Sequence, residues 1–381
     1  MTGKWECLAC GGQRLKSVAD LGTSPVLTGA LFDDRESARR AVRGRLDLAC
    51  CGDCGHVQNV AFDPELVEYD VSYDNSLHFS GTFQQYADHL VARLVDTYDV
   101  RGRHVVEIGS GKGDFLGAIA RAGGNAGTGY DPTVAPDTTI PGVRLVQDYF
   151  RPGDQAEHYD LLVCRHVLEH LDDPATLLRS LATSAPDGAM HYVEVPSAEF
   201  NFGPDGLWDC IYPHVSYFST GSLQALLRRC GFEIESLGRS FHGQFISADV
   251  RAGDPADMLG DATEHVRVVG EFARCHRQSV ARWKSEVAAS GRRGQTVAVW
   301  GAGSKGVNFL NAVDPDGMLP AVDINPRKWG RFLPGGGHQV IAPEDLGELD
   351  VSTVAVTNPV YRDEIAGTLA DLGVCARVVT V

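Results

Sequence analysis

The chain has 381 residues, of which 43% are hydrophobic and 22% charged, and its formal net charge at pH 7 is −16. The length suffices for two or three domains with cores of their own, and the composition is that of an ordinary globular protein. The acidic balance argues against nonspecific binding of nucleic acid or of an anionic membrane, both of which need a basic surface. The first residues lack the apolar segment of a signal peptide and no run of 18 apolar residues occurs, so we expect a cytoplasmic protein.

Two pairs of cysteines stand near the start of the chain, Cys7 and Cys10 in CLACGG and Cys51 and Cys54 in CGDCG. Each pair predicts a knuckle-like turn in which the following glycine lets backbone N–H groups point at sulfur. Four thiolates suit a tetrahedral zinc ion with no position left for water, so the metal would have a structural role. Disulfides are the alternative, which a cytoplasmic location disfavours. The long stretch between the pairs must loop out, and Cys50 is predicted to be a bystander.

A glycine-rich turn follows at residues 105–115, VVEIGSGKGDF. The pattern predicts a strand ending near Glu107, a tight turn and a helix N-terminus, an arrangement that lets the backbone approach a nucleotide-like ligand. Asp131, 22 positions after Gly109, is expected at the end of the next parallel strand, where an acid accepts hydrogen bonds from ribose hydroxyls. A Rossmann fold for another nucleotide is the alternative, but pyrophosphate binders favour Gly-x-Gly-x-x-Gly and rarely carry an acid before the turn.

Residues 159–171, YDLLVCRHVLEHL, predict a buried strand that runs into a helix. His166 and His170 would share one face of that helix at the carboxyl end of the strand, where ligands bind in open α/β sheets. The two histidines could bind a metal, but no matching third ligand is evident. Glu169 is predicted to be a structural helix residue.

The end of this domain is predicted from a helix at 222–231 and an antiparallel pair of strands at 232–236 and 244–250. Residues 252–290 are charged with helical spacing, which predicts a connecting helix.

A second glycine turn, WGAGSKG at 300–306, follows a predicted strand. Asp323 lies 22 positions after Gly301, which completes a dinucleotide-type fingerprint. The remaining chain is too short for a full Rossmann domain, so we predict a half-sized lobe of about four strands whose helix N-terminus can hold a diphosphate. The alternative is a lobe that only packs against the core, and Lys305 is either a diphosphate ligand or a solvated residue at the helix start.

The chain resembles the class I S-adenosylmethionine (SAM) methyltransferases in four features taken together. These are the acid before the first turn, the acids after the second and third strands, and the VCRHVLEH segment. With the cysteine module before this core and the glycine-turn lobe behind it, essentially the full chain resembles the three-domain, zinc-binding sugar C-methyltransferases, which act on nucleotide-linked 4-keto deoxysugars. The motifs that carry the resemblance are Cys51–Gly55, Tyr73–Ser76, Glu107–Phe115, Arg165–His170, Tyr212–Ser219, Trp300–Gly306, Asp323–Pro326 and Asn358–Tyr361.

The resemblance implies an α/β fold: a Rossmann-like class I SAM-methyltransferase core, an N-terminal zinc-binding module and a small C-terminal Rossmann-like α/β domain. The implied boundaries are 1–70 for the zinc-binding module, 71–250 for the methyltransferase domain, 251–290 for the helical connector and 291–381 for the C-terminal substrate-binding lobe.

Site residues are implied by the same resemblance. SAM would be held by Glu107, Gly109, Ser110, Gly111, Asp131, Pro132, Asp148, Tyr149 and Arg165. The substrate would be held by Tyr73, Asn75, Ser76, Gly303, Ser304, Lys305, Asn325 and Tyr361. Catalysis would involve His214, Tyr212, His170 and His166, and structural zinc would be bound by Cys7, Cys10, Cys51 and Cys54.

The chemistry implied by the family is removal of a proton next to a ketone, formation of an enolate and attack on the methyl group of SAM. Histidine, alone or paired with a carboxylate, has a pKa suited to the first step. Related sequences place a glutamate directly before the histidine that is His214 here, but this chain has Pro213. Proline cannot orient or activate an imidazole, so His214 would have to act as the base alone.

Three other functions stay open at the level of sequence. Pro213 makes methyl transfer to oxygen or nitrogen of a sugar or natural-product acceptor a second hypothesis. Redox chemistry with NAD at the C-terminal turn is disfavoured by the short lobe, and a non-catalytic sugar-nucleotide binder is disfavoured by the intact SAM-type residues. The expected partner is a small molecule of the nucleotide diphosphate sugar class, with no nucleic acid and no membrane, and the oligomeric state is not predicted.

Overall fold

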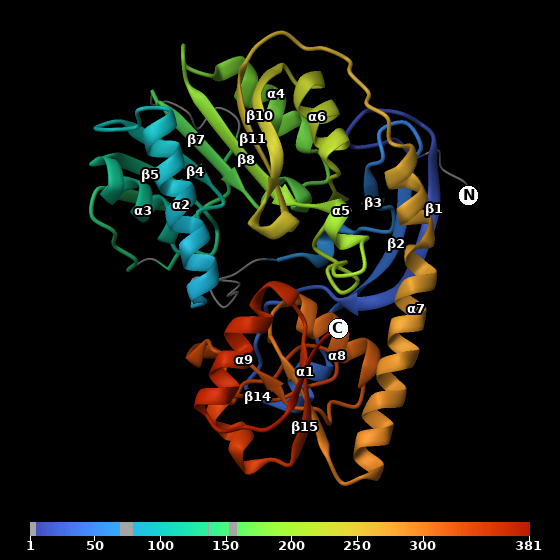
Figure 1. Ribbon diagram of the computed structural model, residues 1–381. Coiled ribbons are helices and arrows are strands. Elements are labelled where there is room, and N and C mark those ends of the chain that lie inside the picture. Colours follow the sequence, from blue (N-terminus) through green and yellow to red (C-terminus); the bar gives the residue numbers. More distant parts are fainter. Residues whose placement is uncertain (1–4, 69–78, 136, 152–157) are drawn as a thin grey trace.

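The computed structural model describes residues 5–68, 79–135, 137–151 and 158–381, and within these residues the strands form three sheets (Figure 1). An antiparallel sheet near the N-terminus and a central seven-stranded sheet lie above a parallel sheet formed by the C-terminal part of the chain. No helix in the described ranges has an apolar stretch long enough to cross a membrane. The predicted positions Tyr73, Asn75 and Ser76 lie outside the described residues.

The N-terminal sheet combines distant parts of the chain. It contains β1 (Leu15–Pro25), β2 (Arg43–Cys51), β3 (Val57–Asn59) and β9 (Ser216–Tyr217), in that order. Because β9 comes from the connection between two strands of the central sheet, the segment around His214 is anchored to the N-terminal module. A short 3₁₀ helix, η1 (Pro64–Leu66), ends this module.

Residues 26–42, between β1 and β2, form a segment that we call the strap, and it contains the short helix α1 (Arg35–Arg39). The strap loops out as predicted and reaches the C-terminal lobe. There Phe32 and Phe332 exchange backbone hydrogen bonds of 3.0 and 2.9 Å as an antiparallel bridge.

The central sheet has the order β10-β11-β8-β7-β4-β5-β6. Its parallel strands are β4 (His104–Ile108), β5 (Ala126–Tyr130), β6 (Val143–Val146), β7 (Leu161–Arg165) and β8 (Met190–Pro196). The predicted antiparallel pair is β10 (Phe232–Ser240) and β11 (Phe245–Ala252), and both strands are longer than the sequence indicated. The chain winds outward in one direction from β4 and in the other from β7, so the carboxyl ends of these neighbours form a topological switch point, where open α/β sheets bind ligands.

Helices cover both faces of the central sheet. α2 (Gly81–Thr97) and α3 (Asp114–Gly123) bury their apolar sides on one face, and α4 (Pro174–Ser184) and α6 (Thr220–Arg229) on the other. The short elements α5 (Ala198–Asn201), η2 (Leu168–His170) and η3 (Phe241–Gly243) lie in the connections. Phe115, Leu116 and Ile119 of α3 are all buried, which explains why an apolar helix directly follows the glycine turn.

The long helix α7 (Thr263–Arg292) has 30 residues and runs along the N-terminal sheet to the C-terminal lobe (Figure 1). The predicted connector is helical only from Thr263, because residues 253–262 form no regular element. Val269, Phe272 and Trp283 of α7 are buried in one hydrophobic cluster with residues of both neighbouring domains. Each such buried side chain contributes about 1.5 to 3 kcal/mol of hydrophobic stabilisation, so α7 firmly joins the N-terminal module to the C-terminal lobe.

The C-terminal lobe has five parallel strands among the described residues, one more than predicted. In sheet order they are β14 (Val340–Ile341), β13 (Ala321–Val322), β12 (Thr296–Trp300), β15 (Val351–Val356) and β16 (Arg377–Thr380). Helices α8 (Ser304–Val313) and α9 (Arg362–Asp371) and the 3₁₀ helices η4 (Pro326–Lys328), η5 (Pro343–Glu348) and η6 (Pro359–Tyr361) complete it. β13 and β14 have two residues each, too few for a recognisable alternating pattern.

Candidate active site and metal centre

A cavity of about 730 Å³ lies between the carboxyl ends of the central strands and the glycine turn of the C-terminal lobe. Its lining includes both glycine turns, three histidines and residues that follow β12 and β15. The switch points of two different sheets therefore face one space, which suits a pair of ligands that must meet.

The first glycine turn is shaped by positive backbone angles. Gly109 has φ 73° and donates its N–H to the Tyr130 carbonyl at 2.9 Å, and an added Cβ would lie 2.3 Å from a methyl group of Val167. Gly111 has φ 53°, and within the described structure a Cβ there would meet no atom within 4 Å. Glycine is thus required at Gly109 for packing, whereas at Gly111 it keeps the cavity open.

Asp131 is fixed at the end of β5. Its carboxylate accepts hydrogen bonds from the N–H of Gly111 at 2.8 Å and from the N–H and hydroxyl of Thr133 at 2.8 and 2.5 Å. Asp131 and Pro132 line the cavity, as does Tyr149. Asp148 instead forms a two-pronged ion pair with Arg151 at 2.8 Å and, in the part of the chain that is described, does not line the cavity. The structure therefore does not bring Asp148 to the predicted position.

Two buried ionisable groups, Glu107 and Arg165, lie beneath the glycine turn. Glu107 is buried, and in the described structure one of its carboxylate oxygens has no hydrogen-bond partner. Burial raises the pKa of Glu107 to about 8, although Arg165 acts in the opposite direction. Arg165 donates to Glu194 at 2.9 Å and stacks over Phe115 at 4.2 Å, so it supports the cavity wall. Ser110 and Arg165 both line the cavity.

These residues fit SAM. Backbone at Gly111 is open to the cavity, Asp131 offers a fixed carboxylate, and the unsatisfied oxygen of Glu107 provides a buried acceptor beneath the turn. A buried acceptor without a partner is rare in folded proteins unless a ligand satisfies it.

His166 and His170 do not share a helix face, contrary to the sequence-based prediction. His166 has φ 55° and lies in a bend, and His170 ends the 3₁₀ helix η2. The next α-helix cannot extend back to them because it begins at Pro174 with Asp173 as its N-cap, and proline is accommodated only in a first helical turn. Both histidines nevertheless line the cavity.

The imidazole of His166 lies between two buried carboxylates. Its Nδ1 is 3.6 Å from Glu169 Oε1 and its Nε2 is 3.3 Å from Glu194 Oε1. Burial alone lowers the pKa of His166, but the two carboxylates outweigh burial and raise it to about 9. His166 is therefore positively charged near neutral pH. Glu194 is held by Arg165 and by the hydroxyls of Tyr86 and Tyr192 as well.

His170 and His214 face each other at a ring-centroid distance of 4.9 Å. The backbone carbonyl of Pro213 lies 3.0 Å from His170 Nδ1, so this proline does orient an imidazole, through its main chain. This contact does not bear on the prediction that Pro213 cannot orient His214, because the carbonyl is hydrogen-bonded to His170. His214 is buried, and its Nδ1 has no hydrogen-bond partner among the described residues. Burial lowers the pKa of His214 well below its ordinary value.

Glu169 is a cavity residue that the sequence prediction assigned to the helix scaffold. Its side chain is 1% exposed, and neither carboxylate oxygen has a hydrogen-bond partner in the described parts of the chain. One of its oxygens and one ring nitrogen each from His170 and His214 all lie within 4.8 Å of one another. Its position directly before His170 was the available sequence signal.

Tyr212 lies outside the cavity lining of the described residues. Its hydroxyl accepts a hydrogen bond from the Asp63 N–H at 2.8 Å, and its ring stacks on Phe62. The ring also fills the space over Gly44, where an added Cβ would lie 2.1 Å away. Tyr212 thus links the domains instead of pointing toward the three histidines.

The C-terminal lobe contributes the predicted residues Gly303, Ser304, Lys305, Asn325 and Tyr361 to the cavity. Lys305 is not a solvated residue at the helix start, since its ammonium group lies 3.0 Å from Asp209 and donates to Gln244 at 3.2 Å. Asn325 Nδ2 and the Tyr361 hydroxyl are buried without hydrogen-bond partners in the described structure. These two groups are suited to a polar ligand.

The second glycine turn is closely packed. An added Cβ at Gly306 would lie 1.7 Å from the Gly301 carbonyl oxygen, so the helix after the turn requires glycine there. Asp323, at the dinucleotide-type position, accepts from the Ala302 N–H at 2.9 Å and pairs with Lys328 at 3.0 Å. Its carboxylate serves the fold, which disfavours the use of this lobe for an ordinary dinucleotide.

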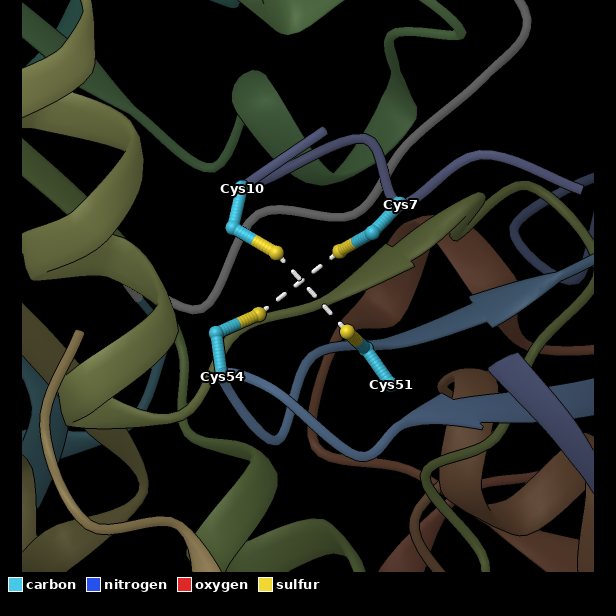
Figure 2. Close-up of side chains that lie close together, drawn as sticks. All are labelled: Cys7, Cys10, Cys51 and Cys54. Carbon is cyan, nitrogen blue, oxygen red and sulfur yellow. Dashed lines mark hydrogen bonds between the residues drawn. The ribbon is translucent and has the colours of Figure 1, made fainter. Parts of the chain in front are cut away.

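The four predicted zinc ligands converge at the edge of the N-terminal sheet (Figure 2). Sulfur atoms of Cys7 and Cys54 are 3.6 Å apart and those of Cys10 and Cys51 are 3.7 Å apart. A tetrahedral ion with Zn–S bonds of about 2.3 Å needs sulfur separations of roughly 3.8 Å. These distances fit zinc, and they are too long for disulfides.

Backbone donors support the sulfurs, as the glycine-containing turns predict. Gly12 N–H points at Cys10 Sγ and Asp53 N–H points at Cys51 Sγ, each at 3.4 Å. Such donors orient thiolates and reduce their mutual repulsion. Cys50 lies in an apolar cluster and takes no part in the group of four.

Three family models match successive parts of the chain. A zinc binding domain matches residues 7–65, a methyltransferase domain matches residues 79–237, and a C-methyltransferase C-terminal domain matches residues 261–375. The order is that of the three structural units described above.

Among individual relatives, the C-methyltransferase NovU of Streptomyces niveus is 27% identical over 371 residues, which cover 89% of this chain and 86% of the relative. The tRNA U34 carboxymethyltransferase of Campylobacter hominis is 26% identical over 140 residues, covering 34% of this chain and 46% of its own. Among solved structures, the magnesium protoporphyrin IX methyltransferase of Synechocystis PCC 6803 with bound SAH is 19% identical, with 45% and 84% coverage and a TM-score of 0.36.

Proposed function

Because the chain belongs to the SAM-dependent methyltransferases that join a zinc-binding domain, a class I core and a C-methyltransferase C-terminal domain, we propose that it methylates a carbon atom of a nucleotide-linked keto-deoxysugar. The observation that carries the proposal is the histidine group between two glycine turns in one cavity. A cavity of about 730 Å³ has room for cofactor and acceptor together.

SAM supplies an electrophilic methyl group when it is bound. Gly109 and Gly111 shape the turn that holds it, Asp131 offers its fixed carboxylate to hydroxyl groups, and Glu107 offers a buried oxygen. Positioning of the two reactants in one cavity provides most of what this step requires.

The C-terminal lobe is the proposed site of the acceptor's nucleotide part. The N-terminus of α8 presents backbone N–H groups and a partial positive charge toward the cavity, next to Ser304 and Lys305. Asn325 Nδ2 and the Tyr361 hydroxyl supply further polar contacts. Lys305 is partly neutralised by Asp209, so we assign it a supporting role in diphosphate binding.

His214 is the proposed base. Its lowered pKa keeps the imidazole neutral near pH 7, so it can take the proton from the carbon next to the keto group. The C–H electron pair then moves into a new carbon–carbon double bond, and the carbonyl oxygen gains negative charge. His166 is charged at this pH and lines the same cavity, so its field stabilises the enolate.

A second candidate is methyl transfer to oxygen or nitrogen, which the replacement of the family's glutamate by Pro213 favours. His214 would then remove a proton from a hydroxyl or amino group in place of carbon. Such an acceptor would need no exchangeable proton at carbon, and this difference separates the two candidates.

The test is mass spectrometry of thymidine diphosphate-linked and other nucleotide-linked 4-keto deoxysugars incubated with the enzyme and SAM in deuterated water. We expect one added methyl group at the carbon next to the ketone, and deuterium at that carbon in recovered unmethylated sugar, where the enolate has been reprotonated by solvent. His214→Ala should abolish both while leaving SAM affinity nearly unchanged. Methylation at oxygen or nitrogen without deuterium uptake would refute the carbon assignment, and wild-type rates for His214→Ala would remove His214 from the mechanism.

A further inference from the structure

The buried carboxylate of Glu169 accepts no hydrogen bond within the residues that the structure describes. Its closest cationic group is His166, whose Nδ1 lies 3.6 Å from Oε1, beyond hydrogen-bond distance. A carboxylate that is 1% exposed loses most of its hydration, a cost that folded proteins normally offset with hydrogen bonds or a paired charge. A hydrogen-bond donor that reaches Glu169 during the reaction would therefore stabilise this buried carboxylate.

Among the described residues, His214 in turn lacks a hydrogen-bond acceptor at Nδ1 and a paired negative charge beside its ring. Its Nδ1 is buried and unpaired in the described structure, and its neighbours oppose a positive charge, because His170, His166 and Lys305 all act to lower its pKa. A base that takes up a proton here becomes a buried cation, which is costly without a nearby carboxylate. One oxygen of Glu169 lies within 4.8 Å of a His214 ring nitrogen, a gap that small side-chain rotations can close to a hydrogen bond.

We propose that Glu169 is the carboxylate that positions His214 and balances its charge after proton uptake, replacing in space the glutamate that this chain lacks at position 213. Glu169 is a positioning residue in this scheme, since it acts through His214 and not on the substrate. The inference rests on the proposed function only for the identity of the proton donor.

The surrounding charges leave Glu169 available for this role. His166 already has Glu194 at 3.3 Å on its other nitrogen, and Glu194 is itself anchored by Arg165. His166 therefore keeps a carboxylate partner when Glu169 turns toward His214. Lys305, the other cation that acts on His214, is paired with Asp209 at 3.0 Å.

A metal ion is the competing occupant of the same place, because Glu169, His170 and His214 could offer two nitrogens and one oxygen. The hydrogen bond from His170 Nδ1 to the Pro213 carbonyl, at 3.0 Å, is compatible with either occupant, because it leaves the other ring nitrogen of His170 available. A bound ion would, however, add positive charge beside His166, which is already protonated near neutral pH.

The experiment compares Glu169→Gln, Glu169→Asp and the double variant Glu169→Gln/Pro213→Glu in the full-length, zinc-loaded protein. The exposed carboxylate Glu344 supplies the matched control, Glu344→Gln. For Glu169→Gln we expect kcat to fall by about 100-fold with KM little changed, which is the usual range for loss of support to a general base. Glu169→Asp should recover part of the loss, and the double variant at least tenfold.

Two pH measurements separate positioning from a structural role. Loss of the carboxylate removes charge that favours the imidazolium, so the acidic limb of the kcat/KM profile should move to lower pH in Glu169→Gln. Nitrogen NMR of the His214 ring in ligand-free protein should show the same downward shift in its pKa, and this readout needs no substrate. If the wild-type enzyme methylates none of the keto-sugars, the proposed function fails. The titration of the His214 ring still decides whether Glu169 pairs with His214.

Three outcomes would overturn the inference. The first is an unchanged kcat and pH profile in Glu169→Gln. The second is loss of activity that the double variant does not restore, together with an unshifted His214 titration, which indicates a packing role. The third is a second metal equivalent per chain, beyond the zinc of the four cysteines, that disappears in Glu169→Gln and assigns the residue to an ion.

Discussion

Several of the residues to which we assign ligand binding and catalysis are buried polar groups that lack hydrogen-bond partners within the described fold. Glu107 lies below the first glycine turn, Glu169 and His214 line the cavity from the central domain, and Asn325 and Tyr361 line it from the C-terminal lobe. Since folded proteins satisfy most buried polar atoms internally, a series of such atoms along one cavity marks where ligands are bound. Their free-energy cost in the ligand-free protein can be measured.

Glu107 provides this measurement through pH. Burial raises its folded pKa to about 8 from 4.5, so the folded protein holds the proton more tightly than the unfolded chain does. The associated stability is fully present below pH 4.5 and is lost as pH rises through 8. We therefore expect Glu107→Gln to stabilise the ligand-free protein at pH 9 by a few kcal/mol, on the order that linkage gives for a buried group, and to change little at pH 4.5.

The comparison uses urea unfolding at both pH values, with Glu344→Gln as the exposed control, and SAM titration at pH 7.5. SAM affinity of Glu107→Gln should fall, because an amide NH2 donor replaces one of the two buried carboxyl oxygens. Equal effects on stability at both pH values would show that the folded protein already compensates the ionised carboxylate.

At the scale of elements, the segments whose structure is set by local chemistry are the ones the sequence predicts well. The strand, glycine turn and helix around Gly109 follow from β-branched residues, glycines and an apolar helix face, and the cysteine turns follow from glycine and sulfur. The bend at His166 departs from the predicted helix because Asp173 and Pro174 start a new helix, a local signal that the apolar periodicity of the preceding residues obscured.

Other features depend on contacts between distant segments and leave no local pattern. Tyr212 sits in a motif shared with active-site residues, yet its hydroxyl bonds to the backbone of Asp63, 149 positions away. Likewise Pro213 orients His170 with a carbonyl group, which every residue type possesses. The sequence assigns Glu169 to the helix scaffold, and only the fold shows that its carboxylate lies among the cavity histidines.

The zinc knuckles give a prediction at this scale because the chain offers its own control. Cys51 is one of the four converging cysteines, whereas its neighbour Cys50 is buried among apolar side chains. Cys51→Ser should abolish the single equivalent of zinc and unfold the N-terminal sheet, since structural zinc contributes folding free energy directly. Cys50→Ser should retain the zinc.

Elemental analysis of the purified variants measures the zinc content per chain, and circular dichroism and thermal unfolding report the structure. Treatment of the wild-type protein with a strong chelator should reproduce the Cys51→Ser result. Full zinc content in Cys51→Ser, or equal loss in both variants, would contradict the assignment of the four ligands.

At the scale of the whole molecule, the three domains are interleaved rather than placed in series. β9 of the central segment completes the N-terminal sheet, and the strap of residues 26–42 reaches the C-terminal lobe (Figure 1). On the other side of the cavity, Glu364 of α9 accepts hydrogen bonds from the hydroxyls of Ser80 and Thr82 at the start of α2. The C-terminal lobe, which lines one side of the cavity, is thereby held from two directions.

The strap should therefore control acceptor binding from a distance. Arg39 donates to the backbone carbonyls of Gly336 at 3.1 Å and Asp316 at 2.5 Å, and in the same strap the Thr28 hydroxyl donates to Ser304 of the second glycine turn at 2.9 Å. Arg39→Ala removes two charge-assisted hydrogen bonds, a loss of about 1.5 to 3 kcal/mol each before relaxation. We expect faster amide exchange in residues 314–338 and in the strap, and a several-fold higher KM for the acceptor.

The adjacent Arg40 is the control, because its ion pair is with Glu36 inside the same short helix. Arg40→Ala should leave both amide exchange and KM close to wild type, and SAM affinity should be unchanged in both variants, since the first glycine turn lies in the central domain. If Arg39→Ala weakened SAM and the acceptor equally, the strap would act on the stability of the whole chain. A selective effect on the acceptor is expected from the geometry, because the strap contacts the C-terminal lobe at the second glycine turn. Among the contacts of the described residues, it does not reach the first glycine turn.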